Sequence, residues 1–302
     1  MNETRRGVIF GATAYLLWGV FPLYFPLLDP SGPVEVLAHR ITWSLVVMAV
    51  VVLAVSKQSA VRRVVADRRR LAQLTAAACV LCVNWGVYIY GVTSDHVVET
   101  SLGYFINPLV TVLLGVFVLR EQLRPVQWGA LGIATLAVLV LSVENGRPPW
   151  IALVLAFSFG TYGLLKKTAR VGAVEGLAIE TAVLAPLAVA YLVVLGATGG
   201  STFLSEGPGH ATLLVLTGII TAVPLLFFGG AASRVPLTTL GPLQYLAPIV
   251  QFLIGVLVFH EHVGPLKALG FVLVWTALVI FTADVVGHAR RSRLRVPVVE
   301  PV

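Results

Sequence analysis

The sequence predicts an all-α integral membrane protein with ten transmembrane helices, arranged as two inverted repeats of five helices each. Three observations lead to this fold class. Hydrophobic residues make up 58% of the chain and charged residues only 12%, whereas about a quarter of the residues in a soluble domain are charged. Long segments such as 109–119 and 126–143 contain no charged residue. The sequence also repeats itself at a spacing of 140 residues.

The repeat runs without gaps through the most distinctive part of each half. Duplicated membrane halves enclose a central site in many secondary transporters, so the repeat favours transport over other membrane functions. We expect a first five-helix repeat at 1–145, a second, inverted one at 146–287, and a disordered basic tail at 288–302. Residues that recur 140 positions later are Glu35 and Glu175, Pro108 and Pro248, Gly115 and Gly255, Glu121 and Glu261, and Pro125 and Pro265.

The ten helices follow from the length of apolar sequence that crosses a bilayer, about 20 residues. The first follows Arg5 and Arg6 and is as long as a span, without a small-residue cleavage site, so we expect a retained helix. Pro125 and Pro265 open the fifth and tenth helices, at the first helical position, which proline tolerates. The predicted spans lie near residues 8–28, 34–55, 71–92, 99–119, 126–143, 149–165, 176–196, 211–231, 238–259 and 265–283.

Basic residues between the spans predict the orientation. The side that carries them is cytoplasmic by the positive-inside rule. Both termini then lie in the cytoplasm, and the chain is a multi-pass protein of the bacterial cytoplasmic (inner) membrane. Because five spans per repeat is an odd number, the second repeat enters the membrane with the opposite orientation. The basic positions on this side are Arg5, Arg6, the segment 57–70, Arg120, Arg124, the segment 166–170, Arg234 and the segment 290–295.

The net charge of +7 does not predict nucleic-acid binding, because the basic residues lie in short segments between apolar runs, where they contact the headgroups of membrane lipids. The segment 57–70 serves as an orientation signal or lies on the inner leaflet as an amphipathic helix. Cys79 and Cys82 form no disulfide framework. His260-Glu261-His262 lacks the spacing of a zinc-binding H-E-x-x-H motif. We therefore expect no metal, no cofactor and no enzymatic activity.

Each half contains a polar stripe with a proline on one face of an otherwise apolar span. Since lipid cannot satisfy polar groups, we expect both stripes to face the interior of the bundle. Two interpretations stay open: the stripes line opposite walls of a central substrate cavity, or they pack helix against helix around a proline kink. The residues are Tyr104, Pro108 and Thr111 in the fourth span and Gln244, Pro248 and Gln251 in the ninth.

Three further residues are candidates for the cavity wall. Asn84 and Tyr88 share a face of the third span. An amide in mid-span is costly unless it is paired, so Asn84 should point to the bundle interior, for packing or for substrate contact. Trp18 in the first span either lines the cavity or belongs to the packed core.

Arg40 and Glu180 occupy matching positions in the two repeats, and charges within a span are candidates for function. Inversion separates them by about 14 Å along the membrane normal at a rise of about 1.5 Å per residue, so we expect no contact between them. They either gate and select at the two mouths or form local structural pairs. Expected partners are Glu99, Glu35 or Asp95 for Arg40, and Lys167 or Arg234 for Glu180.

His39 and Glu180 are the candidates for coupling transport to protons, because a carboxylate shielded from water can exchange a proton during a transport cycle. Facilitated movement down a gradient fits the sequence as well. The fifth and tenth spans carry few polar side chains. We therefore expect them at the periphery, facing lipid or the second protomer of a homodimer.

The segment Glu99–Leu109, together with His39-Arg40 and Asn84-Trp85, resembles the RarD branch of the EamA-type permeases, in the drug/metabolite transporter superfamily. The resemblance covers nearly the whole chain. It implies ten helices in two inverted halves and the export or exchange of small metabolites or drug-like compounds. We expect alternating access; the alternatives are a non-transporting receptor or scaffold and a membrane-embedded enzyme. The aromatic and amide-bearing stripes suit amino-acid-like or aromatic solutes better than phosphates.

Overall fold

The computed structural model describes residues 2–93, 97–143, 150–258 and 264–294. Within these ranges every regular element is a helix, which confirms the all-α prediction. The elements of the first half are α1 (Glu3–Gly19), η1 (Phe21–Leu23), η2 (Phe25–Leu28), α2 (Pro33–Ala54), α3 (Gln58–Ala66), α4 (Arg68–Thr93), α5 (Val97–Phe117) and α6 (Pro125–Val143). Those of the second half are α7 (Trp150–Ala169), α8 (Ala173–Ala197), α9 (Gly207–Ala232), α10 (Leu237–Gln244), α11 (Leu246–Leu257) and α12 (Pro265–Leu294).

Several of these helices have the length and apolar composition of membrane spans, which confirms a multi-pass membrane protein. Shorter apolar stretches lie in α5, α6 and α12. The count of ten spans stays a prediction. Among the described residues, the six stretches that meet both criteria are Glu3–Leu23, Pro33–Ala54, Arg68–Tyr88, Ala173–Ala197, Gly207–Ala232 and Leu237–Ile254.

Prolines divide two of the predicted spans. The first span is not one α-helix to residue 28: α1 ends at Gly19 and continues as two short 3-10 turns, each with a proline, Pro22 or Pro26, near its start. The ninth divides into α10 and α11 at Tyr245. Pro248 has no N–H to donate to the carbonyl of Gln244, so the α-helical ladder is interrupted one turn earlier.

Two segments near the basic side differ from their expected form. The apolar side of α3 packs on protein rather than lipid, because Val64 is buried among α4, α8 and the end of α7. This contradicts the placement of the segment 57–70 on the inner leaflet with its apolar face in lipid. At the other end of the chain, α12 continues as a helix to Leu294, beyond the predicted boundary of the disordered tail at 287.

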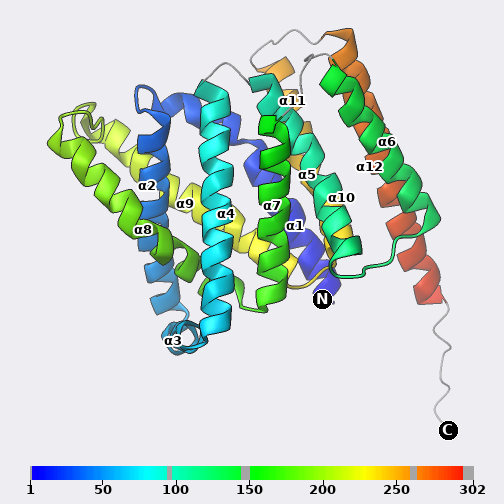
Figure 1. The fold of residues 1–302 in the computed structure, drawn as a ribbon, viewed down its shortest axis with the longest axis horizontal. Coiled ribbons are helices and arrows are strands. Elements are labelled where there is room, and N and C mark those ends of the chain that lie inside the picture. Colours follow the sequence, from blue (N-terminus) through cyan, green and yellow to red (C-terminus); the bar gives the residue numbers. More distant parts are fainter. Residues whose placement is uncertain (1, 94–96, 144–149, 259–263, 295–302) are drawn as a thin grey trace.

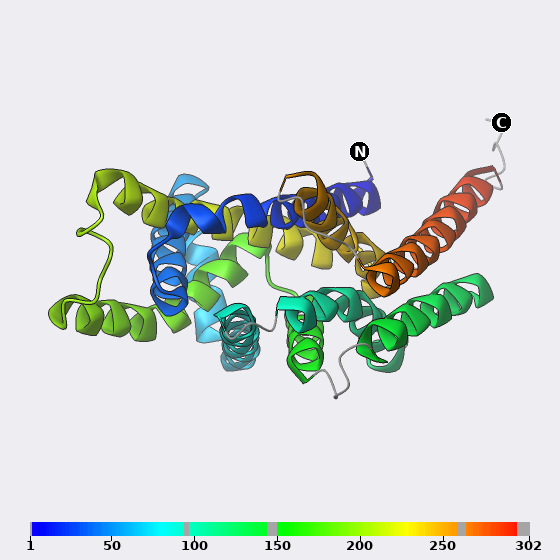
Figure 2. The ribbon, with the colours of Figure 1, turned by 90° about the horizontal axis from the view of Figure 1, so that it is seen from above.

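Helices of the two halves pack against one another throughout the molecule. α2 lies against α8 and α9, α4 and α5 lie against α7, and α1 lies along α9, α10 and α11. α6 packs on α12, and Figures 1 and 2 show this pair at one end of the molecule, with the α8–α9 connection at the opposite end. The position of α6 and α12 agrees with the peripheral location expected for the fifth and tenth spans. A homodimer through these helices stays a prediction.

A close crossing of α2 and α9 positions the most unusual charged side chain. A β carbon at Gly218 would lie 2.5 Å from the backbone carbonyl carbon of Trp43, so only glycine permits this approach. Small residues at helix crossings are a regular device of membrane proteins. The Ser44 hydroxyl donates to the Gly218 carbonyl at 3.2 Å and fixes the crossing. Thr221, one turn further along α9, is thereby brought to Arg40 on α2.

Candidate functional site

Arg40 lies in the interior, with only 8% of its surface exposed. Its Nε donates a hydrogen bond to the Thr221 hydroxyl at 2.9 Å. The guanidinium carbon lies 4.8 Å from the ring centroid of Trp85 on α4 and 5.7 Å from that of Phe25 on η2. Two aromatic faces therefore hold the charge by cation–π attraction, which is worth up to about 2 kcal/mol when water is excluded.

Two tyrosines complete the surroundings of this guanidinium. Tyr88 on α4 and Tyr104 on α5 pack edge to face, with ring centroids 5.8 Å apart. Both phenol groups are close enough to interact electrostatically with Arg40. Both rings are half-buried. We use the name Arg40 cluster for Arg40, Phe25, Trp85, Tyr88, Tyr104 and Thr221.

Arg40 does not pair with Glu35, one of its three expected partners. The Glu35 carboxylate instead accepts hydrogen bonds from the Ser201 hydroxyl at 3.0 Å and from the Thr202 backbone N–H at 2.8 Å. The other two expected partners, Glu99 and Asp95, have side chains outside the described part of the chain. Among the side chains that are described, no carboxylate lies within salt-bridge distance of the guanidinium.

Glu180, the repeat equivalent of Arg40, has a complete set of partners. The Lys166 ammonium donates to one carboxylate oxygen at 2.8 Å and the Tyr162 hydroxyl to the other at 3.1 Å. The prediction of Lys167 or Arg234 was wrong. Tyr162 and Lys166 are four residues apart and share the face of α7 that meets α8. Lys167 points elsewhere, and its ammonium donates to the Val235 carbonyl at 2.7 Å.

Arg234 is likewise engaged away from Glu180, in an ion pair with Glu3 at 2.9 Å. Neither Arg40 nor Glu180 contacts the other within the described structure, as the inverted geometry predicted. The Tyr162 ring stacks on Phe228 with centroids 5.6 Å apart, and Phe228 in turn contacts Trp18 at 5.8 Å. Trp18 therefore belongs to a packed aromatic core beside Glu180. We use the name Glu180 cluster for Glu180, Lys166, Tyr162 and Phe228.

The two polar stripes touch in this structure instead of facing each other across a space. The Gln244 amide donates to the Thr111 hydroxyl at 2.9 Å, and both residues are buried. The Gln251 amide donates to the Trp18 carbonyl at 3.2 Å. Pro248 is buried as well. These contacts favour the packing interpretation for Thr111, Gln244 and Gln251, while Tyr104 belongs to the Arg40 cluster.

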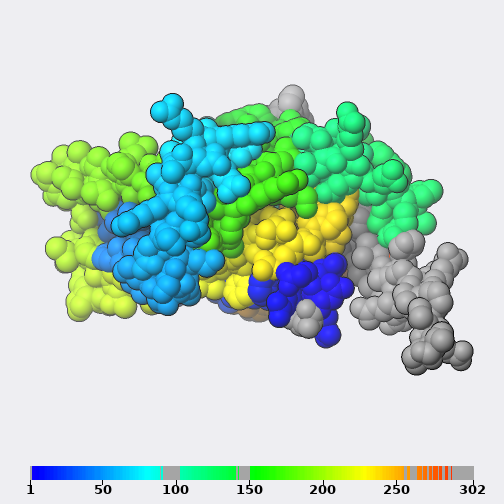
Figure 3. Space-filling model, turned by 90° about the horizontal axis from the view of Figure 1, so that it is seen from below, coloured from blue at the N-terminus to red at the C-terminus, as the bar shows by residue number. Residues whose placement is uncertain are grey.

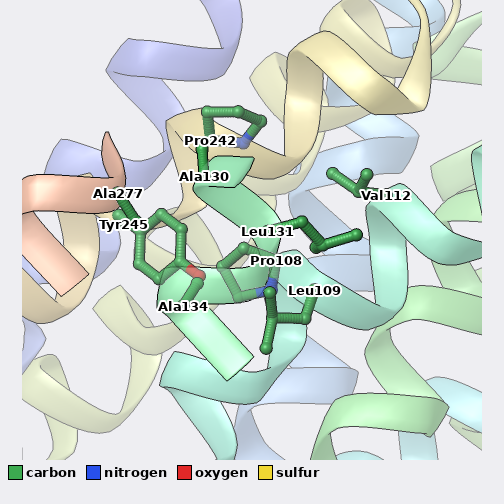
Figure 4. Close-up of a pocket in the computed structure, with 9 residues that line it drawn as sticks. All are labelled: Pro108, Leu109, Val112, Ala130, Leu131, Ala134, Pro242, Tyr245 and Ala277. Carbon is green, nitrogen blue, oxygen red and sulfur yellow. The ribbon is translucent and has the colours of Figure 1, made fainter. Parts of the chain in front are cut away.

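Pro108 borders a separate apolar pocket between α5, α6, α10 and α12 (Figure 4). The pocket encloses about 310 Å³ of empty space. Its single polar side-chain group is the Tyr245 hydroxyl, which is buried and has no hydrogen-bond partner in the described structure. The pocket offers apolar contact but no charge. Its lining residues are Pro108, Leu109, Val112, Ala130, Leu131, Ala134, Pro242, Tyr245 and Ala277.

Asn84 and His39 lie in local networks of their own. The Asn84 amide donates to the Leu155 carbonyl and the Ser158 hydroxyl, both at 2.9 Å, which satisfies it by packing α4 on α7. His39 accepts a hydrogen bond from the Trp43 indole at 3.3 Å and stacks on Phe203 with ring centroids 4.8 Å apart. Its Nε2 lies 4.0 Å from the Glu35 carboxylate.

Sequence analysis missed several members of these clusters. Thr221 gave no signal, because a threonine in an apolar helix is common and its partner is 181 residues away. Phe25 was counted as part of a transmembrane helix and not as an aromatic wall. Tyr162 and Lys166 had a usable signal, since their spacing puts them on one face of α7.

Comparison with known proteins agrees with this architecture. Residues 5–143 match the model of the EamA-like transporter family. The chain is 55% identical over 300 residues to Protein RarD of Streptomyces exfoliatus, covering 99% of this chain and 95% of that protein. It is 39% identical over 292 residues to Protein RarD of Escherichia coli (strain K12), covering 96% and 98%.

Two further similarities extend the comparison. The transporter YojE of Bacillus subtilis (strain 168) is 40% identical over 294 residues, covering 96% of this chain and 98% of that protein. A crystal structure with 21% sequence identity superimposes with a TM-score of 0.69 and covers 91% of this chain and 97% of its own, so the two share a fold. With its several apolar spans, this chain belongs to the EamA-like transporter family and is a multi-pass inner-membrane permease of the RarD type.

Proposed function

We propose that this permease moves small molecules by alternating access, with two inverted five-helix halves that rock about a site near the membrane midplane. The spacing of the helices carries the proposal. Helices of the second half begin 140 residues after their counterparts, so equivalent sequence forms equivalent structure. The matched first residues are Pro33 of α2 and Ala173 of α8, Val97 of α5 and Leu237 of α10, and Pro125 of α6 and Pro265 of α12.

The directions of matched helices support inversion of the second half. In Figure 1, α2 descends from the upper edge of the view whereas its counterpart α8 rises from below. α4 rises and its counterpart α9 descends. Two structurally similar halves with opposite directions allow a shared site to face either side of the membrane in turn.

The distribution of charge supports a cytoplasmic location of both termini. The start of α1, the basic segment around α3 and the end of α12 all lie at the lower edge of Figure 1, and Figure 3 looks directly onto this face. Arg68, Arg69 and Arg70 begin α4 beside α3. A single face that gathers both ends of the chain and these arginines fits the positive-inside rule.

Polar contacts between the halves occur near both ends of the helices, as a gated transporter requires. Near the start of α2, the Ser31 and Thr202 hydroxyl groups lie 2.6 Å apart, and Thr202 also binds Glu35. Near the start of α10, the Glu121 carboxylate accepts two backbone N–H groups, at 3.1 Å and 2.9 Å. We propose that one set opens while the other holds.

The proposed substrate site lies between these two sets of contacts. Arg40 acts as a selecting group, with Tyr88 and Tyr104 as contact surfaces. Glu180 holds a fixed buried pair with Lys166 at 2.8 Å, which stabilises its charged form. This favours exchange or facilitated movement over proton coupling through Glu180.

A reversible cross-link tests alternating access. In a protein without Cys79 and Cys82, cysteines replace Ser31 and Thr202, whose hydroxyl groups lie close enough for a disulfide after substitution. In proteoliposomes, uptake and exchange of a panel of small metabolites should stop on oxidation and return on reduction. Each single-cysteine variant should transport under both conditions. Full transport by the oxidised double variant would contradict movement of the halves at this contact.

A labelling experiment tests the inverted arrangement separately. Ser56 follows α2, Thr198 follows the counterpart helix α8, and both are exposed. In intact cells, a membrane-impermeant thiol reagent should label a cysteine at 198 and spare one at 56. Both positions should react after the cells are opened. Equal labelling of the two positions in intact cells would contradict inversion.

A further inference from the structure

The Arg40 cluster holds a buried positive charge that the described residues do not neutralise. Arg40 is 8% exposed, and the one hydrogen bond from its guanidinium goes to the uncharged Thr221 hydroxyl. Cation–π contacts with Trp85 and Phe25 attract the charge without cancelling it. An ionised group kept inside a membrane protein in this way is a functional site by default.

The matching position in the second half shows what a satisfied charge looks like in this fold. Glu180 is bound by the Lys166 ammonium at 2.8 Å and by the Tyr162 hydroxyl at 3.1 Å. The two halves therefore treat equivalent positions differently. One charge has a partner of opposite sign from its own chain, and the other, Arg40, has only neutral neighbours among the described side chains.

The remaining geometry specifies the missing partner. With Nε directed to Thr221, the two terminal nitrogens of Arg40 keep a fork of N–H donors that fits a carboxylate in a bidentate manner. Around this fork stand Trp85, Tyr88 and Tyr104, whose rings are half-buried while the charge itself is buried. Such partly open aromatic faces can stack on a flat apolar body attached to the carboxylate.

We propose that the Arg40 cluster is a recognition site for the carboxylate of a monoanionic or zwitterionic substrate with a planar apolar body. A doubly charged phosphate fits less well, because Arg40 is the single cation that the described part of the cluster contains. The inference rests on the proposed function and names the substrate class of the same permease. The carboxylate supplies the opposite charge, and the aromatic rings supply contact area and exclude larger polar solutes.

The test compares acids with their uncharged amides on the purified full-length protein in lipid nanodiscs. The probes are phenylacetate with phenylacetamide, benzoate with benzamide, and indole-3-acetate with indole-3-acetamide. Binding is measured as the rise in unfolding temperature over a concentration series, since a ligand that binds the native state stabilises it in proportion to its affinity. The acids should bind at least about tenfold more tightly than the amides, because a bidentate charge-assisted contact is lost in the amide.

Two additional probes identify the source of the carboxylate. Phenylalanine tests a zwitterion, and phenyl phosphate tests a dianion. Binding of phenylalanine at least as tight as that of phenylacetate would support an amino-acid-like substrate within the same class. Tighter binding of phenyl phosphate than of any acid would overturn the proposal. Equal affinity for acid and amide in all three pairs would overturn it as well.

Variants assign the effect to Arg40. Arg40→Gln should remove the preference for acids, and Arg40→Lys, which keeps the charge and loses the fork, should reduce it. Arg234→Gln is the matched control, because this arginine pairs with Glu3 outside the cluster. If Arg40→Gln does not fold, the comparison of acids with amides on the unaltered protein still decides the question.

The binding readout is independent of transport. Acid-selective binding together with full transport by the oxidised cross-linked protein would support the site and contradict alternating access. Transport of amides and acids at equal rates, with equal binding, would leave the permease proposal standing and remove the carboxylate site.

Discussion

The buried pair of Lys166 and Glu180 offers the sharpest test of how the interior of this permease is solvated. Their side chains are 4% and 2% exposed and their charged atoms are 2.8 Å apart. At this separation, an effective dielectric constant of about 20 corresponds to an attraction of about 6 kcal/mol. Desolvation of both ions consumes most of that gain. The pair should therefore contribute little net stability, although losing one partner should cost much.

Lys166→Met and Glu180→Leu, made singly, should each lower the free energy of unfolding by about 3–5 kcal/mol, because each leaves one buried charge without its partner. The double variant should lie within about 2 kcal/mol of the unaltered protein; the remaining loss comes from the Tyr162 hydroxyl, which loses its acceptor. Unfolding of the purified protein in mixed micelles with increasing denaturing detergent measures all four corners of the cycle.

The reasoning would be refuted by single losses below about 1 kcal/mol that simply add in the double variant. That result would mean that water screens both charges in the native state. The pair would then line a hydrated space instead of the packed core in which Tyr162 and Phe228 lie fully buried.

Two further predictions concern contacts between the halves. Gly218→Ala should destabilise the protein by about 1–3 kcal/mol, because its β carbon would lie 2.5 Å from the Trp43 backbone, while Gly209→Ala, with nothing within 4 Å, should leave stability unchanged or improve it. The same unfolding titration checks both, and equal effects would contradict the close crossing. Glu121→Ala should cost about 1–2 kcal/mol, because two N–H groups at the start of α10 lose their acceptor. Glu206→Ala is the control, since its side chain caps no helix, and a loss at Glu206 as large as that at Glu121 would contradict the cap.

Much of the fold could be predicted from the sequence, because membrane helices announce themselves by apolar runs of a set length and by the prolines that open them. The predicted starts near residues 34, 126 and 265 lie within a residue of α2, α6 and α12. The breaks at the end of α1 and between α10 and α11 were not predicted. A proline inside an apolar run is compatible with a kink, a 3-10 turn or a full break, and the packing around it selects among them.

The candidate site was predicted in its members more than in its contacts. Arg40, Tyr88 and Tyr104 were all chosen as functional candidates, and the structure brings them together. The partner of Glu180 was wrong by one residue, Lys166 instead of Lys167. One step along a helix turns a side chain by about 100°, so a single position separates a buried ion pair from a contact with a different helix.

The sequence by itself determined that this is a duplicated, all-helical membrane protein, because hydrophobicity and repetition are properties of the chain that need no partner. Only the tertiary structure decided that Arg40 meets Thr221 and the aromatic rings while Glu180 meets Lys166. Periodicity orients a side chain about its own helix axis. The rotation and depth of one helix against its neighbour depend on how all the helices pack together, and these two quantities determine which charges meet.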